Sequence, residues 1–498
     1  MPFYIFCLVV VLFYVFFTML LNLLFSIILH GHSIKIISII ILICNSACLY
    51  FMNTFGIQID MYMIMNVFET NIPEISDLIN LRLMMYILSV GVLPSAFIAK
   101  KVKIKANSRG IVDNFRLGLI SLLVIVAIMT PSLYFRKSFI FLKTENRYTL
   151  CYLLPVNYIG NFIRLVLVKS KNMISAKNII KISNYTNIKD VPHINNNKNL
   201  ILIVIGESAR SQNFSLNGYW RNTNEPLDKF NVISYKNVYS CGTFTSHSIP
   251  CIFSHLGKKE FNLLESKKYE NILDIFKSLG FDVRWLSNNG DCKGVCSRIR
   301  FTSTGGLDNF GLDESLIIAL NRNLRQLKDY STVIILNQRG SHDPFYKRYP
   351  AEFEKYKPSC RKSFSNCPTD ELINTYDNTI YYTSYNISRM IDILKNKMKD
   401  YNTMLLYVSD HGSGLGENGV WSHTMPYGQA GEYVTKVPML LWFSEGFREE
   451  FRISEECLKN DLSKKLSHDN IFHSLLGLFW IENRYYDENL DIFKDCRK

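Results

Sequence analysis

Apolar residues are concentrated in the first 135 positions of the chain, whereas the remainder mixes apolar and polar residues as a soluble protein does. Four runs in the apolar region are candidates for membrane-spanning helices, which need about 20 apolar residues. They cover residues 3–29, 36–55, 81–99 and 117–133. The first run lacks the basic flank and the small-residue cleavage site of a signal peptide, so we expect it to be retained. The pattern predicts an α-helical transmembrane domain over residues 1–135.

A basic cluster between the third and fourth runs sets the expected orientation. It contains Lys100, Lys101, Lys103 and Lys105, followed by Arg109 and Arg116. Positive side chains that flank membrane spans tend to stay in the cytoplasm. The fourth span should therefore lead outward, and everything after it should lie outside the cytoplasm.

The loop between the second and third runs falls on the same outer side, and we expect a helix there near residues 58–78. Asn66, Thr70 and Glu74 recur in it at intervals of four and would share one face of that helix. Pro73 works against a continuous helix. A solvated helix at the membrane interface is the alternative to a binding role for these three residues.

Residues 136–198 are expected to bridge the membrane domain and a soluble domain. Basic and aromatic residues alternate there with short apolar runs, as in amphipathic segments at the membrane interface, and an Asn- and Lys-rich linker follows near 184–198. From residue 199 to 498 the pattern changes to short apolar strands with helical segments such as 378–397 between them. The expected strands are 200–205, 283–286, 332–336, 404–408 and 439–443. This alternation predicts a doubly wound α/β sheet, in which ligands bind at the carboxyl ends of the strands.

Charge and cysteine content narrow the setting of the protein. The formal charge is +13, which in a chain with so much apolar sequence favours a lipid surface over nucleic acid, for which no motif is present. Of the twelve cysteines, six form three close pairs that suggest disulfides and an oxidising compartment: Cys241 with Cys251, Cys292 with Cys296, and Cys360 with Cys367. A zinc–thiolate site at Cys292 and Cys296 has no second pair at the usual spacing.

Residues that suit a metal-assisted reaction lie at the expected strand ends. Glu207 directly follows the first strand, and Asp410 and His411 follow the strand at 404–408. Thr245 lies in the turn into an expected helix, whose N-terminus favours a phosphate. Together these side chains form a plausible zinc site, and zinc lowers the pKa of a bound hydroxyl. The alternative is that Thr243 or Thr245 only caps the helix.

Two further histidines lie in loops that follow strands. His342 and His423 are candidates for proton transfer or for orienting a second metal ion. A structural role is the alternative for both. His468 and His473 fall in a C-terminal helical segment and are expected to be structural.

Seven segments carry a resemblance to a known family: Gly206-Glu207-Ser208-Ala209-Arg210, Asn217-Gly218-Tyr219, Cys241-Gly242-Thr243-Phe244-Thr245, Gly340-Ser341-His342, Asn374-Thr375-Tyr376-Asp377-Asn378-Thr379, Ser409-Asp410-His411-Gly412 and Leu415-Gly416-Glu417-Asn418-Gly419-Val420. Together they closely resemble the phosphoethanolamine transferases, and the branch that modifies lipid A in particular. The resemblance runs from about the family's second span to the C-terminus. It implies a multi-pass enzyme of the Gram-negative inner membrane with an alkaline phosphatase-like, or sulfatase-like, domain in the periplasm.

The resemblance also implies roles for individual residues. Thr245 would be the nucleophile that becomes phosphorylated. Zinc would be held by Glu207, Thr245, Asp410 and His411, and a second zinc ion during turnover is left open. Asn289 and Lys293 match the segment that binds phosphoethanolamine, with the catalytic candidates His342 and His423 close by. Asn66, Thr70 and Glu74 match a family pattern near the active site, and the three cysteine pairs match family disulfides.

The implied reaction moves phosphoethanolamine from phosphatidylethanolamine to a phosphate of lipid A through a phosphorylated threonine. The resemblance implies that the modified lipid A confers resistance to cationic peptides such as polymyxin. The expected partners are the donor lipid, lipid A or lipopolysaccharide and membrane lipids, with no nucleic acid, and the chain is expected to be a monomer. Alternative acceptors are a core sugar of lipopolysaccharide or a periplasmic glucan. A phosphoglycerol donor, phosphatase or sulfatase activity and a non-catalytic membrane scaffold also remain open.

Three features depart from the family pattern. The chain is expected to start at the family's second span. Ser413 and Gly414 stand where the family has Glu-Ser after Asp-His-Gly, which removes a carboxylate beside the expected metal site. Asp343 stands where the family has glycine after Gly-Ser-His. None of the three changes an expected zinc ligand.

Overall fold

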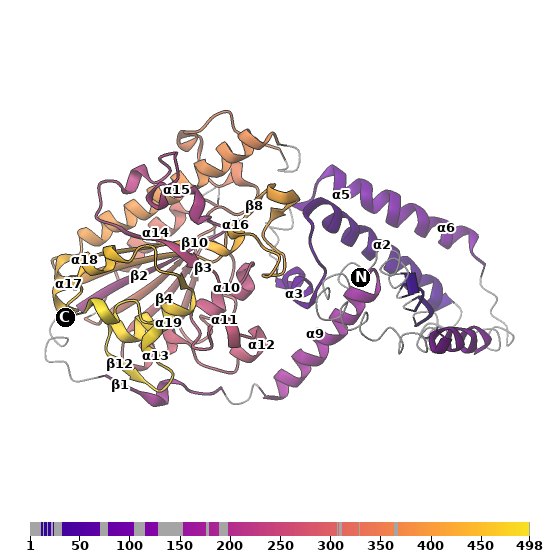
Figure 1. The fold of residues 1–498 in the computed structure, drawn as a ribbon, viewed down its shortest axis with the longest axis horizontal. Helices are drawn as coiled ribbons and strands as arrows, with labels where there is room; N and C mark the ends of the chain where they lie inside the picture. The colour runs from indigo at the N-terminus through magenta and orange to yellow at the C-terminus, as the bar shows by residue number, and fades with distance from the viewer. Residues whose placement is uncertain are drawn as a thin grey trace. The chain divides into compact units, whose positions relative to one another are not determined.

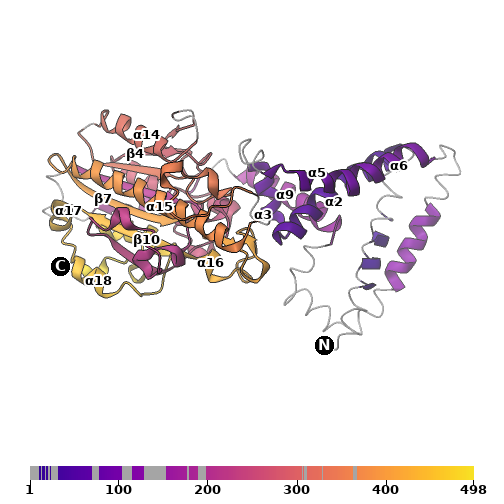
Figure 2. The same cartoon turned by 90° about the horizontal axis from the view of Figure 1, so that it is seen from above.

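The computed structural model describes residues 32–69, 78–103, 115–127, 153–175, 179–188 and 198–497, apart from 306, 308–310, 328 and 363–366, together with a few residues between 11 and 23. The chain divides into two compact units, residues 1–168 and 169–498. Figures 1 and 2 show a helical first unit and an α/β second unit built around one sheet.

Two helices of the first unit have the length and composition of membrane spans. α2 (His32–Phe55) contains the candidate span Ser33–Phe55. α5 (Leu81–Tyr86) continues through the π-helical segment Ile87–Val92 into α6 (Leu93–Lys101), and together they form the candidate span Leu81–Lys101. These helices coincide with the second and third expected runs. The helix at Phe115–Ala127 covers part of the fourth run but is shorter than a span, and the first run lies largely outside the described residues.

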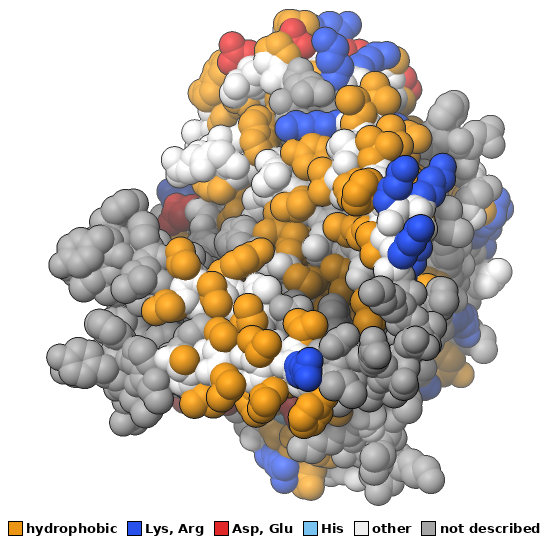
Figure 3. Space-filling view, turned by 90° about the vertical axis from the view of Figure 1, so that its right-hand side faces the viewer, with side chains coloured by type: hydrophobic (Ala, Val, Ile, Leu, Met, Phe, Trp, Pro, Cys, Tyr) orange, Lys and Arg blue, Asp and Glu red, His pale blue; other side chains and the backbone are white. Residues whose placement is uncertain are grey.

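The remaining described helices of this unit are α3 (Met61–Glu69) and α9 (Val156–Ser175). The side chain of Asp60 accepts a hydrogen bond from the N–H of Met63 at 2.7 Å, which stabilises the start of α3. The side chain of Asn161 on α9 donates to the carbonyl of Ile59 at 3.2 Å, so α9 is tied to the same segment. Among the described residues on the face in Figure 3, hydrophobic side chains predominate over charged ones, as expected for helices that meet lipid.

The second unit is organised around an eight-stranded sheet of order β11-β3-β10-β7-β2-β6-β4-β5. The strands are β2 (Lys198–Gly206), β3 (Ile233–Tyr239), β4 (Asp282–Ser287), β5 (Arg300–Ser303), β6 (Thr332–Asn337), β7 (Tyr401–Ser409), β10 (Lys436–Phe443) and β11 (Leu466–Ser467). The strands β7, β2, β6, β4 and β5 are parallel, whereas β10 is antiparallel to both of its neighbours. The carboxyl ends of five neighbouring strands therefore meet at one edge.

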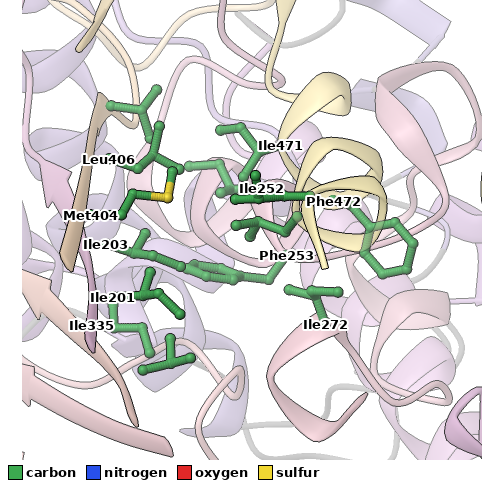
Figure 4. Packing of buried hydrophobic residues seen from close by; sticks show 14 of the residues in the cluster. Ile201, Ile203, Ile252, Phe253, Ile272, Ile335, Met404, Leu406, Ile471 and Phe472 are labelled. Carbon is green, nitrogen blue, oxygen red and sulfur yellow. The ribbon is translucent and has the colours of Figure 1, made fainter. Parts of the chain in front are cut away.

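Successive side chains of each strand point to opposite faces, and both faces of the central strands are buried. On one face Ile201, Ile203, Ile335, Met404 and Leu406 pack against side chains of α10 (Thr245–Ile252), α13 (Ile272–Ser278) and α19 (Asp469–Leu478) (Figure 4). The other face packs against α14 (Glu314–Leu324) and α15 (Thr369–Lys395). Each such buried aliphatic or aromatic side chain contributes about 1.5–3 kcal/mol, so the core holds the strand ends rigidly.

The predicted fold class is confirmed, and all five expected strands are present with slightly longer bounds. β3, β5 and β11 were not expected. The reason is their polar or short sequence: β3 includes the exposed Lys236, all four residues of β5 are exposed, and β11 has two residues. α15 begins at Thr369, nine residues before the expected helix at 378–397, because its first turns are rich in Thr, Asn and Tyr rather than in strong helix formers.

Four disulfides link described cysteines of the second unit. The pairs Cys241–Cys251, Cys292–Cys296 and Cys360–Cys367 are as expected. The fourth, Cys457–Cys496, was not predicted, because its cysteines lie 39 positions apart and sequence alone does not determine the pairing of distant cysteines. Part of the expected linker is also ordered, since β1 (Thr186–Ile188) pairs antiparallel with β12 (Ile481–Asn483) near the C-terminus.

Candidate active site

The ends of two adjacent parallel strands bring the expected metal ligands together. Gly206, the last residue of β2, lies opposite Ser409, the last residue of β7. Glu207 and Asp410 are the next residues of their strands and therefore emerge side by side. The N–H of Asp410 donates to the carbonyl of Gly206 at 3.0 Å, which extends the pairing to the ligand itself.

Glu207, Asp410 and His411 form a buried group whose ligand atoms all lie within 4.8 Å of one another, so the group could hold a metal ion. Nε2 of His411 lies 3.4 Å from Oε1 of Glu207 and 3.2 Å from Oδ2 of Asp410. One imidazole nitrogen and several carboxylate oxygens are a donor set that zinc accepts.

The hydrogen bonds around this group leave its metal-binding atoms available. Nδ1 of His411 lies 2.8 Å from the carbonyl oxygen of Gly412, which can only accept, so Nδ1 carries the proton and Nε2 keeps its lone pair. Gly412 is necessary here, because a Cβ at this position would lie 2.1 Å from the carbonyl oxygen of Tyr433. Oδ1 of Asp410 accepts from the N–H groups of Ser208 and His411, while Oδ2 is buried without a hydrogen-bond partner among the described residues.

The electrostatics of the three residues also suit a cation. Burial, and next the charge of Glu207, raise the pKa of Asp410 well above its ordinary value. Burial also raises the pKa of Glu207, but His411, His342 and hydrogen bonds from Ser208 and Thr245 outweigh it and leave the pKa below its ordinary value. Burial lowers the pKa of His411 below its ordinary value, although the charge of Glu207 opposes that shift. A cation among these groups would offset the repulsion between the two carboxylates.

Thr245 is the first residue of α10, and its hydroxyl faces the carboxylate group. Oγ1 donates to Oε2 of Glu207 at 2.9 Å and lies 3.3 Å from Nε2 of His411. The N-cap residue is Phe244, which makes no side-chain cap. Oγ1 of Thr243 instead donates to the carbonyl of Met425 at 2.6 Å. The capping interpretation is therefore wrong for both threonines, and the N-terminus of α10 lies beside the hydroxyl of Thr245.

His468 holds the segment of Thr245 against the strand that carries the ligands. Its Nδ1 accepts from the N–H of Cys241 at 3.1 Å, so its Nε2–H donates to the carbonyl of Ser409 at 2.9 Å. Burial lowers its pKa to about 3, which keeps the ring neutral with one donor and one acceptor. The structural role expected for His468 is confirmed. His473 is also bonded structurally, since its Nδ1 accepts from the N–H of Asp487 at 3.0 Å.

The loop after β4 brings Asn289 to the same site. Nδ2 of Asn289 donates to Oε2 of Glu207 at 2.8 Å, so this oxygen receives hydrogen bonds from both Asn289 and Thr245. Lys293 lies within the short loop closed by the disulfide Cys292–Cys296, and its ammonium pairs with Asp291 at 3.3 Å.

His342 and His423 lie next to the carboxylate group. The ring of His423 stacks on that of His411 with centroids 4.2 Å apart, and the ring of His342 is 6.1 Å from that of His423. Nδ1 of His342 donates to the carbonyl of Asp343 at 2.8 Å, which leaves Nε2 as the base. Burial, together with His411 and His342, lowers the pKa of His423 well below its ordinary value. The two rings therefore lie close enough to the nucleophile group to be candidates for proton transfer.

The structure also describes the residues that differ from the family pattern beside the site. Ser413 is 1% exposed, and Gly414 begins the short strand β8 (Gly414–Leu415). Asp343 lies in the loop that Arg348 fixes by donating to the carbonyls of His342 and Asp343 at 2.7 and 2.8 Å. Burial raises the pKa of Asp343 to about 6.

The remaining expected site residues belong to the helical unit. Asn66 lies on α3 and is half-buried. Thr70 and Glu74 lie outside the described residues, so their alignment with Asn66 stays a prediction.

Comparison with known protein families gives two matches. Residues 199–481 match the family described as Sulfatase, and residues 17–169 match the family described as Phosphoethanolamine transferase EptA/EptB. The two matches cover the α/β unit and the helical unit in turn.

Individual relatives match over nearly the whole chain. Phosphoethanolamine transferase EptA of Escherichia coli (strain K12) is 34% identical over 468 residues, which cover 92% of this chain and 84% of that protein. Phosphatidylethanolamine transferase Mcr-1 of Escherichia coli is 31% identical over 467 residues, which cover 90% and 84%. Among solved structures, the integral membrane protein lipooligosaccharide phosphoethanolamine transferase A (EptA) from Neisseria meningitidis superposes with a TM-score of 0.86 at 31% identity, covering 96% of this chain and 90% of that one.

Proposed function

Because the chain belongs to the phosphoethanolamine transferase family, we propose that it transfers phosphoethanolamine from phosphatidylethanolamine to a phosphate of lipid A, with Thr245 as the nucleophile. The chain is an integral membrane enzyme with a periplasmic catalytic domain. The observation that carries the proposal is the hydroxyl of Thr245, 2.9 Å from Glu207 and 3.3 Å from Nε2 of His411 at the start of a helix.

Zinc fits the donor set of this site. The ligands would be Glu207, Thr245, Asp410 and His411, of which Asp410 offers a buried carboxylate oxygen without a partner among the described residues and His411 a neutral ring nitrogen. The periplasmic domain of EcEptC from Escherichia coli, which has a similar fold at 20% identity and a TM-score of 0.54, was solved in complex with Zn. When bound, zinc would supply Lewis acidity that lowers the pKa of the threonine hydroxyl and offsets phosphoryl charge.

In the first step, Oγ1 of Thr245 attacks the phosphorus of phosphatidylethanolamine. A Thr245–phosphorus bond forms, the bond from phosphorus to the glycerol oxygen breaks, and diacylglycerol leaves with a proton. Thr245 is the first residue of α10, and the positive end of the helix dipole there would favour the phosphoryl charge that accumulates on the adduct. Asn289 fixes the carboxylate that orients the nucleophile, and Lys293 is the candidate cation for the phosphoryl oxygens.

In the second step, a phosphate oxygen of lipid A attacks the phosphorus of the threonine adduct. The bond to Oγ1 of Thr245 breaks, and the hydroxyl is restored when it regains a proton. His342 and His423 are the candidates for moving that proton, because their rings lie beside the nucleophile group. Asn66, Thr70 and Glu74 would contribute from the membrane side to lipid substrate binding.

The setting of the reaction follows from its two lipid substrates. A multi-pass protein of the Gram-negative inner membrane meets both phosphatidylethanolamine and newly made lipid A at the periplasmic surface. Each transfer adds an ammonium group to lipid A, which reduces its attraction for cationic peptides such as polymyxin.

Mass spectrometry of lipid A after incubation with the full chain, zinc and phosphatidylethanolamine tests this function. We expect lipid A to gain one phosphoethanolamine group with the wild-type chain and with Thr243→Ala, and to remain unmodified with Thr245→Ala. Unmodified lipid A together with transfer to lipopolysaccharide core or to a periplasmic glucan supplied in its place would reject lipid A as the acceptor. Release of free phosphoethanolamine without an acceptor product would indicate hydrolysis.

A further inference from the structure

Asp313 is a buried carboxylate that the proposed chemistry does not use. It is the N-cap residue of α14, where an aspartate ordinarily accepts a hydrogen bond from the first turn of its own helix, yet its side chain makes no such cap. The residue is 4% exposed. A buried carboxylate is costly unless other groups satisfy it, so the partners of Asp313 indicate its role.

Those partners belong to two loops of the candidate active site. Oδ1 of Asp313 accepts from Nδ2 of Asn288 at 2.9 Å and from the N–H of Arg339 at 2.8 Å. Oδ2 accepts from the N–H of Gly340 at 2.9 Å. Asn288 follows β4, whereas Arg339 and Gly340 belong to the loop after β6. One carboxylate therefore ties together the loops that follow two neighbouring strands.

Both loops continue directly to Glu207. Asn289, next to Asn288, donates to Oε2 of Glu207 at 2.8 Å. The N–H of Ser341 donates to the backbone carbonyl of Glu207 at 2.9 Å. Gly340 has a φ of +47° and packs so closely that a Cβ there would lie 2.7 Å from the same carbonyl oxygen. His342 is the next residue along this loop.

We propose that Asp313 is a positioning residue for phosphoethanolamine transfer. Its carboxylate fixes the loops that carry Asn289 and His342, and so the position of these two residues relative to Glu207 and Thr245. It acts through Asn288 and through the N–H groups of Arg339 and Gly340. This inference rests on the proposed function and adds a residue to the same site. Burial raises the pKa of Asp313, while its three hydrogen bonds oppose that shift and favour the carboxylate.

The variant Asp313→Asn tests the proposal in the full chain with zinc, phosphatidylethanolamine and lipid A. The amide keeps the volume of the carboxylate but replaces one acceptor oxygen with a donor that faces an N–H group. We expect kcat to fall by about 10- to 100-fold with KM changed by less than about threefold, because the loss concerns alignment rather than binding. Zinc stoichiometry should stay as in the wild type.

A matched control separates positioning from stability. Asp491 is also buried and satisfied by hydrogen bonds, at 2.8 Å from both the hydroxyl of Tyr486 and the N–H of Phe493. Asp491→Asn should lower the unfolding midpoint as Asp313→Asn does, yet leave kcat unchanged. The proposal is overturned if Asp313→Asn keeps kcat within about twofold of the wild type, or if both variants lose kcat equally.

Hydrogen exchange gives a readout that does not depend on the reaction. Amide exchange in peptides that span residues 337–343 should be faster in Asp313→Asn than in the wild type and in Asp491→Asn. Unchanged exchange there would overturn the proposal. Absence of transfer by the wild-type chain would count against the proposed function, while the exchange result would still decide the role of Asp313.

Discussion

Asp410 shows at the scale of one residue why this site suits a metal ion. Its Oδ1 is engaged by two N–H groups, at 3.1 and 2.7 Å, while its Oδ2 is buried without a partner among the described residues. A buried acceptor that remains unsatisfied costs about 1–3 kcal/mol. A cation that binds Oδ2 removes this cost, so metal binding and stability should be coupled.

The substitution Asp410→Asn should therefore remove zinc binding. The amide keeps the shape and the oxygen that faces Ser208 and His411, but it lacks the free carboxylate oxygen. We expect zinc to raise the thermal unfolding midpoint of the wild type and to leave that of the variant unchanged. Metal analysis by mass spectrometry and calorimetry measure the two effects.

Asp469 provides the matched control for that substitution. It lies in the other described group with metal-ligand geometry, next to Cys241 and Cys251, but those two cysteines form a disulfide. Asp469→Asn should bind zinc as the wild type does. If Asp469→Asn lost zinc and Asp410→Asn retained it, the metal would bind beside Asp469, and the assignment to Glu207, Asp410 and His411 would be wrong.

At this scale the sequence predicted the site residues that directly follow strands. It did not predict Asp313, whose hydrogen-bond partners lie on loops distant in the sequence. Glu207, Asp410 and His411 could be predicted because the end of a parallel strand is a known place for ligands. The role of Asp313 could not, since its partners lie 25 to 27 positions away on loops whose contacts only the fold creates. Asp313 does occupy the N-cap position of α14, but its side chain bonds to the two loops instead of to its own helix.

Secondary-structure elements determine how the site is held together. β2 and β7 place Glu207 and Asp410 side by side, and α10 starts at Thr245 after the disulfide-linked Cys241. The hydrophobic runs predicted the central strands well, because those strands are buried on both faces. The antiparallel direction of β10 and the polar strand β3 depend on how the chain returns to the sheet, which periodicity does not encode.

The disulfide Cys457–Cys496 should stabilise the α/β unit more than Cys360–Cys367 does. It closes a loop of 39 positions rather than 7, and the entropy of the unfolded chain then predicts a difference of about 1.5 kcal/mol. Replacing each pair by alanine and following denaturant unfolding by tryptophan fluorescence measures both effects. All five tryptophans lie between residues 220 and 480, so the signal reports on this unit. An equal cost for the two pairs would contradict the expectation.

For the whole molecule, the orientation in the membrane determines on which side the second unit catalyses the proposed reaction. The basic cluster at 100–116 predicts a cytoplasmic loop, and the disulfides of the second unit indicate an oxidising compartment. Two described helices have the properties of spans, so the number of crossings remains a prediction of the hydrophobic pattern.

Cysteine labelling tests this orientation. A membrane-impermeant maleimide applied to spheroplasts should label Met398→Cys, which replaces an exposed residue after α15, and should reach Ser108→Cys only after permeabilisation. The parent chain supplies the background from its native thiols. Labelling of Ser108→Cys in intact spheroplasts would contradict the predicted topology.

Thr245 should carry phosphoethanolamine during the reaction. Mass spectrometry of the peptide that contains Thr245, from the zinc-loaded full chain supplied with phosphatidylethanolamine and no acceptor, measures this directly. We expect phosphoethanolamine on Thr245 in the wild type and in Thr243→Ala, its loss when lipid A is added, and none in Thr245→Ala. An unmodified Thr245 in zinc-loaded protein that still modifies lipid A would contradict the covalent mechanism.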